Sequence, residues 1–423
     1  MSAMTTTTND VTSRVLTAPD SLVGASLAGW LAAGGGTGLR RALDDRAGII
    51  GLIERAGLRG LGGAGFPTHR KWAAVAAEPG PEKVVICNGN EDEPGTFKDR
   101  VLLGRTPHQV IEGALIAALA VGARRVVMYV NPHLTEAIEA VGEAVRQWRA
   151  HALLAALETA LGGPVLLELR PSSGRYIGGE ETAVVASVEG GFPFPRRKPP
   201  YPAQSGVHGL PTLINNAETL ANVPHILRHG AAWFRALGRG EAAGTKLFSL
   251  SGDVQRPGLY ELPMGATLAE LIFDCGGGML MGREFKAVFT GGPSNTLLSR
   301  DDLDVALDFE SVRARGSRLG TGAMIVVSEG TSIPRKVTEF VEFFAEGSCG
   351  QCPPCKTGTY QLATLLRRID TGHATRADLE QVRQLCGLLP GSGRCGLIDG
   401  AITVVASSLE RFGAEYERML IGG

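Results

Sequence analysis

The stretch VVICNGNEDEPGTFKD, residues 84–99, begins with four apolar residues and continues as a polar segment that contains two glycines. Short apolar runs of this kind are typical of buried strands, and a second one, RVVMYV, follows at 125–130. Alanine-rich amphipathic stretches at 107–122 and 134–161 alternate with these runs. The alternation predicts an α/β fold, in which helices join parallel strands. Because ligands of such sheets bind beyond the carboxyl ends of the strands, we expect the polar segment to carry chemistry.

The composition is that of an ordinary globular protein without an overall charge. Basic and acidic residues number 42 and 43 in a chain of 423. We therefore expect no nucleic-acid partner. The longest uncharged stretch, 21–39, contains six glycines, which disfavours a membrane span, and the N-terminus lacks a secretory signal pattern. We expect a cytoplasmic protein without direct membrane insertion.

A chain of this length should divide into several domains. Residues 1–40 begin with a Thr/Asn/Ser-rich segment and become rich in glycine, so we expect a mobile N-terminal tail there. The α/β pattern covers 41–240. Over 241–330, the strand-like runs KLFSLSGDV and GLYELP precede a helix-like run, which predicts a small β-grasp domain. Residues 331–423 have helical periodicity and predict a small bundle.

Three of the seven cysteines lie in the loop SCGQCPPCKTG, residues 348–358. Cys349, Cys352 and Cys355 have the spacing C-x2-C-x2-C, which lets three thiolates of one tight loop bind three corners of a cubane. Zinc sites more often combine two separated C-x2-C pairs around one ion, so zinc is the weaker alternative. Such clustering suits metal ligation in a reducing compartment better than a disulfide framework. The spacing predicts an iron–sulfur cluster of the [4Fe–4S] type.

The fourth ligand must come from Cys386 or Cys395, the two cysteines further along the chain. In LEQVRQLCGLL, Cys386 shares a helical face with Val382 and Leu385, as a small buried hydrophobic residue would. Cys395 lies in GSGRCG, whose glycines allow the backbone to approach a cluster closely. We predict Cys395 as the ligand and place Cys386 in a helix core.

A glycine-rich loop, GLGGAGFPTHRKW, spans residues 60–72 and contains the pattern G-x-G-x-x-G. Dinucleotide-binding loops with this pattern follow a strand, whereas GIIGLIERAGLRG before it has helical periodicity. The pattern alone therefore predicts no dinucleotide site. Its glycines still permit close approach to a planar or phosphorylated ligand, and Lys71 could supply a charge to a phosphate. A purely structural loop is the alternative.

Further segments combine glycine, acids and amides. NGNEDEPGTFKDR at 88–100 and RYIGGEETAVVASVEG at 175–190 each contain paired acids. Glu180 and Glu181 would also suit the start of a helix, where the helix dipole favours anions. RRKPPYPAQSG and NNAETL, at 196–206 and 215–220, add a lysine, a tyrosine and two adjacent amides that could bind a polar ring.

Taken together and in this order, the motifs resemble those of the NADH-binding flavoprotein subunit of respiratory complex I. They equally resemble the diaphorase subunits of soluble NAD-linked formate dehydrogenases and hydrogenases. The resemblance extends over about residues 45–420. It implies a Rossmann-like FMN- and NADH-binding domain at 41–240, a β-grasp domain of the soluble-ligand-binding type at 241–330, and a helical [4Fe–4S] domain at 331–423.

The resemblance also implies individual site residues. FMN would be held by Gly60, Gly62, Gly63, Lys71, Asn88, Asn90, Glu91, Tyr176, Gly179, Glu180, Asn215, Asn216 and Thr219. NADH would lie against Phe66, Glu93, Glu181, Lys198 and Tyr201. Glu93 and Glu181 would accept hydrogen bonds from the nucleotide and donate no proton. The cluster ligands would be Cys349, Cys352, Cys355 and Cys395.

The implied activity is hydride transfer between NAD(H) and FMN, followed by one-electron transfer through the cluster to a partner subunit. The implied partners are a thioredoxin-like [2Fe–2S] subunit and a multi-cluster subunit, through which any membrane association would occur. Five positions differ from the residues common in complex I and favour a soluble dehydrogenase or hydrogenase over complex I: Leu61, His69, Ala74, Asn90 and Gly178.

Two alternatives stay open beside this hypothesis. One is a non-catalytic assembly protein whose cysteines hold zinc, although the intact lysines and acids of the motifs argue against a vestigial pocket. The other concerns the nucleotide. No arginine in the motifs stands ready for a 2′-phosphate, yet the sequence does not decide between NADH and NADPH.

Overall fold

The computed structural model describes residues 15–80 and 82–422. Its first sheet has four parallel strands in the order β3-β2-β1-β4. The strands are β1 (Val84–Gly89), β2 (Arg125–Val130), β3 (Leu166–Pro171) and β4 (Thr212–Asn216). β1 and β2 are almost wholly buried, as their continuous apolar runs require. The prediction of a parallel sheet in a mixed α/β fold is confirmed.

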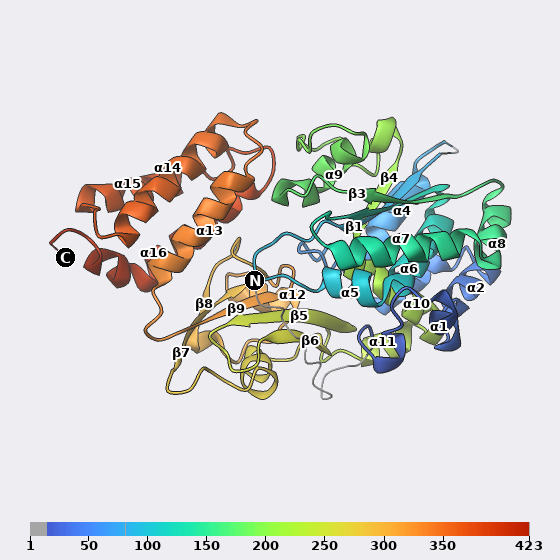
Figure 1. Ribbon diagram of the computed structural model, residues 1–423, viewed down its shortest axis with the longest axis horizontal. Coiled ribbons are helices and arrows are strands. Elements are labelled where there is room, and N and C mark those ends of the chain that lie inside the picture. The colour runs from blue at the N-terminus through green and yellow to red at the C-terminus, as the bar shows by residue number, and fades with distance from the viewer. Residues whose placement is uncertain (1–14, 81, 423) are drawn as a thin grey trace.

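Helices connect these strands and cover the sheet (Figure 1). They are α3 (Ile49–Ala56), α4 (Thr68–Ala77), α5 (Asp99–Arg105), α6 (Pro107–Val121), α7 (Thr135–Arg149), α8 (Ala152–Leu161), α9 (Glu181–Val188), α10 (Ala217–His229) and α11 (Ala231–Ala236), with short turns η2 (Tyr176–Gly179) and η3 (Val207–Gly209). The amphipathic stretch at 134–161 forms two helices, because the His151 side chain accepts a hydrogen bond from the Leu153 amide and begins a new one.

The N-terminal region is packed, and the prediction of a mobile tail is wrong for residues 15–40. Here η1 (Pro19–Ser21), α1 (Leu27–Ala32) and α2 (Thr37–Asp44) contribute buried side chains such as Leu16 and Leu39 to the main core. Three successive amides at 15–17 donate to the Glu261 carboxylate, at 3.0 to 3.2 Å. Apolar side chains between the glycines therefore anchor this segment. Residues 1–14 lie outside the described part of the chain.

The second sheet is mixed and has the order β6-β5-β9-β7-β8. Its elements are β5 (Thr245–Gly252), β6 (Gly258–Pro263), η4 (Glu270–Cys275), β7 (Phe285–Thr290), β8 (Leu298–Ser299), η5 (Arg300–Asp302), α12 (Phe309–Ala314) and β9 (Ala323–Ser328). β5 and β6 form the expected hairpin, and β5 pairs with β9 in parallel. The helix-like run expected after the two strands, ATLAELIFD at 266–274, contains the short π-helix η4.

The C-terminal region consists of helices α13 (Ile333–Gly347), α14 (Pro353–Asp370), α15 (Arg376–Leu388) and α16 (Leu397–Arg418). Val337, Phe340, Val341 and Phe344 recur at helical spacing along α13 and are buried together. In Figure 1 these helices form the upper left lobe, the second sheet lies at the lower centre, and the parallel sheet with its helices lies on the right. No helix among the described residues is long and apolar enough to cross a membrane.

Candidate functional site

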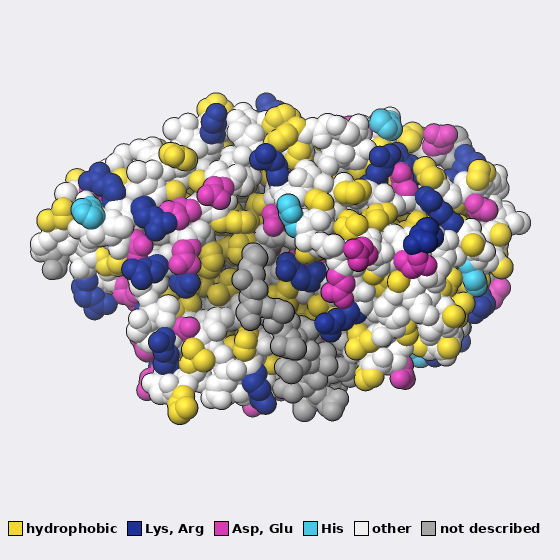
Figure 2. Space-filling model, viewed as in Figure 1, with side chains coloured by type: hydrophobic (Ala, Val, Ile, Leu, Met, Phe, Trp, Pro, Cys, Tyr) yellow, Lys and Arg dark blue, Asp and Glu magenta, His cyan; other side chains and the backbone are white. Residues whose placement is uncertain are grey.

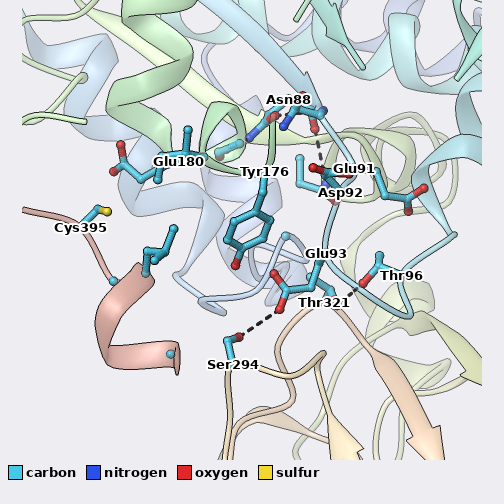
Figure 3. Close-up of a pocket in the computed structure, with 18 of the residues that line it drawn as sticks. Asn88, Glu91, Asp92, Glu93, Thr96, Tyr176, Glu180, Ser294, Thr321 and Cys395 are labelled. Atoms are coloured by element: carbon cyan, nitrogen blue, oxygen red, sulfur yellow. Dashed lines mark hydrogen bonds between the residues drawn. The ribbon is translucent and has the colours of Figure 1, made fainter. Parts of the chain in front are cut away.

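The carboxyl ends of β1 and β4 open onto a cavity of about 530 Å³, bounded also by η2 and by the loops before β9 and α16. On the face shown in Figure 2, hydrophobic side chains gather in the hollow at the middle of the molecule, with charged side chains around it. The cavity brings together residues predicted from distant motifs: Gly62, Asn88, Asn90, Glu91, Glu93, Tyr176, Gly179, Glu180, Asn216 and Cys395. Figure 3 shows several of them converging on one space.

Glu93 and Tyr176 meet at the centre of this cavity (Figure 3). The Tyr176 hydroxyl donates to Glu93, and Ser294 Oγ donates to Glu93 Oε1 at 3.1 Å. Burial raises the pKa of Glu93 to about 7, and these two hydrogen bonds only partly oppose it. The Tyr176 ring packs edge-on against Phe343 and Phe344 of α13, with centroids 5.0 and 5.9 Å away. Glu93 is therefore held by the second sheet and by the C-terminal helices.

Three other predicted residues shape the walls of the cavity through hydrogen bonds to neighbouring segments. Glu91 accepts hydrogen bonds from the Asp99 and Arg100 amides, at 2.8 and 3.2 Å, and so holds the start of α5. Asn215 accepts from the Trp72 indole at 2.8 Å, which turns its side chain into the core. Thr219 accepts from the Leu61 amide at 2.8 Å and fixes the glycine-rich loop.

The glycine-rich loop closes on itself beside the cavity. The Gly60 amide donates to the Phe66 carbonyl at 2.8 Å. Gly63 has φ +139°, and a Cβ built there would meet no atom within 4 Å, so the backbone leaves open space at this point. Phe66 is 50% exposed at the loop's end. Tyr201, on a separate segment, is 53% exposed.

Three predicted residues form an ion cluster next to the loop. Glu181 Oε2 accepts from Lys71 Nζ at 3.2 Å, and Glu181 Oε1 accepts from Lys198 Nζ at 2.7 Å. Burial alone would raise the pKa of Glu181, but the two lysines lower it, so the carboxylate is ionised at neutral pH. Glu180, as predicted, caps α9 by accepting from the Thr182 and Ala183 amides. Lys71, assigned to FMN, and Lys198, assigned to NADH, are thus linked through one carboxylate.

The four predicted cluster cysteines line one small pocket between the loop before α14 and the loop before α16. All four are free thiols. α14 begins at Pro353, inside the cysteine loop, and Cys352 at its N-cap provides no side-chain cap, so the partial positive charge of the helix end faces this pocket. Cys386 lies outside it, on α15, where burial raises its pKa to about 11. The structure groups Cys395, and not Cys386, with the three clustered cysteines.

The pocket offers four thiols from two loops, which is the donor set of an iron–sulfur cubane. Across residues 15–80 and 82–422, no three His, Cys, Asp or Glu side chains are grouped as one metal ion would require. A cubane spaces its thiolate ligands farther apart than a tetrahedral ion does. Cys395 and Leu397 line this pocket and the 530 Å³ cavity as well, so the two sites share a wall.

Comparisons with known proteins agree with this arrangement. The chain matches the Nuo51 FMN-binding domain over residues 53–225, the SLBB domain over 247–294, and the NADH-ubiquinone oxidoreductase-F iron–sulfur binding region over 335–419. It is 42% identical over 387 residues to the NADH-quinone oxidoreductase F 2 subunit of Rhizobium meliloti (strain 1021), covering 91% of this chain and 92% of that protein. The chain belongs to the family of NADH-quinone oxidoreductase F subunits.

Proteins similar to this F-type chain include hydrogenase subunits. The chain is 40% identical to the NADP-reducing hydrogenase subunit HndC of Solidesulfovibrio fructosivorans, over 93% of this chain and 80% of that protein. It also resembles the crystal structure of an NAD⁺-reducing [NiFe]-hydrogenase in the H₂-reduced state, with 37% identity and a TM-score of 0.83. That match covers 90% of this chain and 64% of the hydrogenase chain, so the chain spans just under two thirds of that structure's length.

The sequence did not predict a buried network of charges in the wall of the cavity of this F-type chain. Lys98 Nζ lies 2.7 Å from Asp99 Oδ1, 3.0 Å from Asn216 Oδ1 and 3.0 Å from Glu218 Oε2. Lys246 of β5 also donates to Glu218 Oε2, at 3.1 Å, and to the Leu61 carbonyl. Burial lowers the pKa of Lys246 to about 8, whereas Asp99 and Glu218 outweigh burial and raise that of Lys98. This network connects β5 to the glycine-rich loop.

The second sheet also contributes cavity residues that were not predicted. They are Ser294, Asn295, Arg318 and Thr321. Thr321 Oγ1 lies 2.8 Å from Thr96 Oγ1 of the polar segment after β1. The sequence signals were polar residues close to glycines, in GGPSN at 291–295 and around 316–322, where the chain can turn sharply.

Two departures from the complex I pattern have local explanations in this member of the family. A Cβ at Gly178 would lie 2.5 Å from Ser173 Oγ, so a cysteine would not fit here without movement. Asn90 uses its amide nitrogen to donate to the Arg175 carbonyl at 3.0 Å, which an aspartate could not do. Both substitutions are therefore accommodated by their own surroundings.

Proposed function

We propose that this chain is the NADH-oxidising or NAD⁺-reducing flavoprotein subunit of a multisubunit electron-transfer complex. The observation that carries the proposal is the shared wall: Cys395 lines the pocket of the four cysteines and the cavity at the strand ends. A donor bound in the cavity would lie next to a cluster bound by the cysteines. The match to an FMN-binding domain and to an iron–sulfur region supports the same pairing.

FMN fits the larger cavity. Its volume of about 530 Å³ is typical of ligand sites, which range over roughly 300–1,000 Å³. The residues proposed to hold FMN remain those of the resemblance, with Glu91, Asn215 and Thr219 acting through the walls and the loop. When bound, FMN accepts a hydride from NADH and gives up electrons singly. The protein's own work is to position the two reactants and to exclude water.

NADH would be positioned at the rim by the exposed rings of Phe66 and Tyr201 and by the ion cluster around Glu181. Glu93, deeper in the cavity, would accept a hydrogen bond from the nicotinamide part. Neither carboxylate needs to move a proton. Cys349, Cys352, Cys355 and Cys395 would hold a [4Fe–4S] cluster, which supplies one-electron transfer to the next centre.

We also propose that the first domain is Rossmann-like and that the second is a β-grasp domain. The parallel strand order β3-β2-β1-β4 supports a Rossmann-like FMN-binding domain. The order β6-β5-β9-β7-β8, with a helical turn between β6 and β7, supports a β-grasp domain. We retain the proposed boundaries at 240 and 330, and extend the first domain back to residue 15 because that segment packs into its core.

Two observations bear on the physiological complex: the five positions that differ from residues common in complex I, and the kinds of protein that are similar to this chain. Both NADH-quinone oxidoreductase subunits and a hydrogenase subunit are similar to this chain. We favour a soluble formate dehydrogenase or hydrogenase in the cytoplasm, with a [2Fe–2S] subunit and a multi-cluster subunit as partners. Identification of the chains that co-purify with it tests this choice directly.

Anaerobic purification with visible spectroscopy and metal analysis tests the proposed function. We expect flavin absorption peaks over a broad iron–sulfur shoulder, which NADH bleaches. A colourless protein that contains zinc would overturn the proposal and favour the assembly-protein alternative.

Changing Glu181 to glutamine tests the nucleotide site. The substitution removes two ion pairs and a charged acceptor, so we expect the KM for NADH to rise about fivefold or more. FMN content should stay at the wild-type level. Steady-state kinetics together with flavin quantification measures both effects. An unchanged KM would count against a role for Glu181 in nucleotide binding.

Changing Glu93 to glutamine tests its role through pH. With its pKa raised to about 7, the Glu93 carboxyl is neutral below that pH and ionised above it. An ionised carboxylate accepts hydrogen bonds more strongly, so the KM for NADH should fall about fivefold as pH rises from about 6 to 8. The Glu93→Gln variant should show no such fall. A wild-type KM that is flat over this range would contradict the assignment.

A further inference from the structure

A second cavity, of about 450 Å³, lies between the glycine-rich loop and the loops of the second sheet. One wall is formed by Gly62, Gly63 and Ala64, and the opposite wall by residues 291–295 and 313–321. It shares Gly62, Glu93, Ser294, Asn295, Arg318 and Thr321 with the larger cavity. The backbones of Gly63 and Gly320 form an antiparallel bridge across it. The second sheet thus touches the loop that the proposed function gives to the flavin and the nucleotide.

Two arginines face this cavity without a partner. Arg313 and Arg318 are exposed, and neither guanidinium group forms a hydrogen bond or ion pair with any residue in the described ranges. Arg315, between them in the chain, differs: it pairs with Asp302 and Asp304, at 3.3 and 2.9 Å. Surface arginines normally form ion pairs with nearby carboxylates. Two unpaired guanidinium groups that line one cavity are therefore available to bind an anion.

The side chains that line this cavity carry more positive than negative charge. Glu93 is the one acid among its lining residues within the described chain, and its carboxylate is already engaged by Tyr176 and Ser294. Arginine presents a planar fork of donors that matches the oxygens of a phosphate. A dinucleotide that enters from solvent would meet the two arginines and also the exposed Phe66 of the glycine-rich loop.

We propose that Arg313 and Arg318, at the end of α12 and in the loop before β9, form a phosphate-binding subsite for the nicotinamide dinucleotide. The subsite rests on the proposed function and deepens it, because it adds cationic contacts from a second segment of the chain to that of Lys198. Phosphate is the shared chemistry of two groups on the nucleotide: the pyrophosphate, present in NADH and NADPH, and the 2′-phosphate, present in NADPH alone.

The test uses the holoprotein with Arg313→Gln, Arg318→Gln and the double substitution. Arg300→Gln is the matched control, since it removes the same charge from the same region at an exposed pair with Glu284. The KM and kcat for NADH and NADPH are measured with ferricyanide as acceptor, and the flavin content is measured for each variant. Inorganic phosphate is added as a competitor.

We expect the double variant to raise the KM at least about tenfold, with kcat within about twofold and flavin content unchanged. A rise for both nucleotides assigns the arginines to the pyrophosphate, and a rise for NADPH alone assigns them to the 2′-phosphate. Phosphate should compete in the wild type and lose its effect in the double variant. Arg318→Lys should recover part of the loss.

An unchanged KM for both nucleotides, an equal rise in the Arg300→Gln control, or a loss of flavin would overturn the subsite. These failures differ from failure of the proposed function. In that case the wild-type holoprotein itself would oxidise neither nucleotide.

Discussion

Changing Cys395 to serine should remove the iron–sulfur cluster while leaving FMN bound. Cys395 shares its pocket with the other three cysteines and is the one proposed ligand that comes from the loop before α16. Without it, only three thiolates would remain to hold a cubane. We expect iron and acid-labile sulfide to fall from about four per chain to near zero after anaerobic purification. The flavin-to-protein ratio should not change.

Cys386→Ser is the control for this experiment. Cys386 is partly buried on α15, away from the cysteine pocket. Its replacement should therefore leave iron content and flavin content at wild-type levels. The opposite result, with iron lost from Cys386→Ser and kept in Cys395→Ser, would show that the fourth ligand was assigned to the wrong cysteine.

Among the substitutions proposed here, Lys98→Met should lower the free energy of unfolding the most. Lys98 is fully buried and contacts Asp99, Asn216 and Glu218, all within 3.0 Å. Its loss would leave two buried carboxylates with Lys246 as the nearest compensating charge. Removing one partner of a buried ion pair typically costs about 3–5 kcal/mol. We expect a loss of that size in the free energy of unfolding of the FMN-binding region, measured by denaturant titration with flavin release as the probe.

A second substitution distinguishes lost charge balance from lost packing. Lys98→Met combined with Asp99→Asn leaves one carboxylate, Glu218, facing one cation, Lys246. This double variant should be more stable than Lys98→Met alone. Lys336→Met, which removes an exposed pair with Glu339, should change stability by less than about 1 kcal/mol. A Lys98→Met midpoint no lower than that of Lys336→Met would contradict the role given to the network.

The features predicted best from the sequence were those with a local pattern. Continuous apolar runs identified β1 and β2, because strands buried on both faces need no polar positions. The cysteine spacing and the glycines around Cys395 selected four cysteines that line one pocket. The acids at 180–181 marked the start of α9 through the helix dipole.

Other features depend on contacts between distant segments, which no local pattern contains. Lys98 and Lys246 are joined by Glu218 only after β5 packs beneath the glycine-rich loop. Arg318 and Ser294 reach the cavity only because the second sheet folds against the first domain. The segment at 15–40 resembled a tail in composition, yet its few apolar side chains and the anchor at Glu261 fix it to the core.

The sequence also did not predict the direction in which individual side chains point. Asn215 and Asn216 are adjacent and were predicted alike, but alternation along β4 turns Asn215 toward Trp72 and Asn216 toward the cavity. Glu91 was predicted among the residues that hold FMN, and its carboxylate holds the backbone at the start of α5. In both cases the residue shapes the site through its neighbours.

An anaerobic titration of the purified holoprotein with NADH, followed by visible absorption and electron paramagnetic resonance, tests the central claim most directly. The shared wall at Cys395 predicts that NADH bleaches the flavin and that a reduced-cluster signal appears with it. In Cys395→Ser, NADH should bleach the flavin without any cluster signal. A wild-type protein that carries FMN and iron but shows no bleaching with NADH would contradict the account.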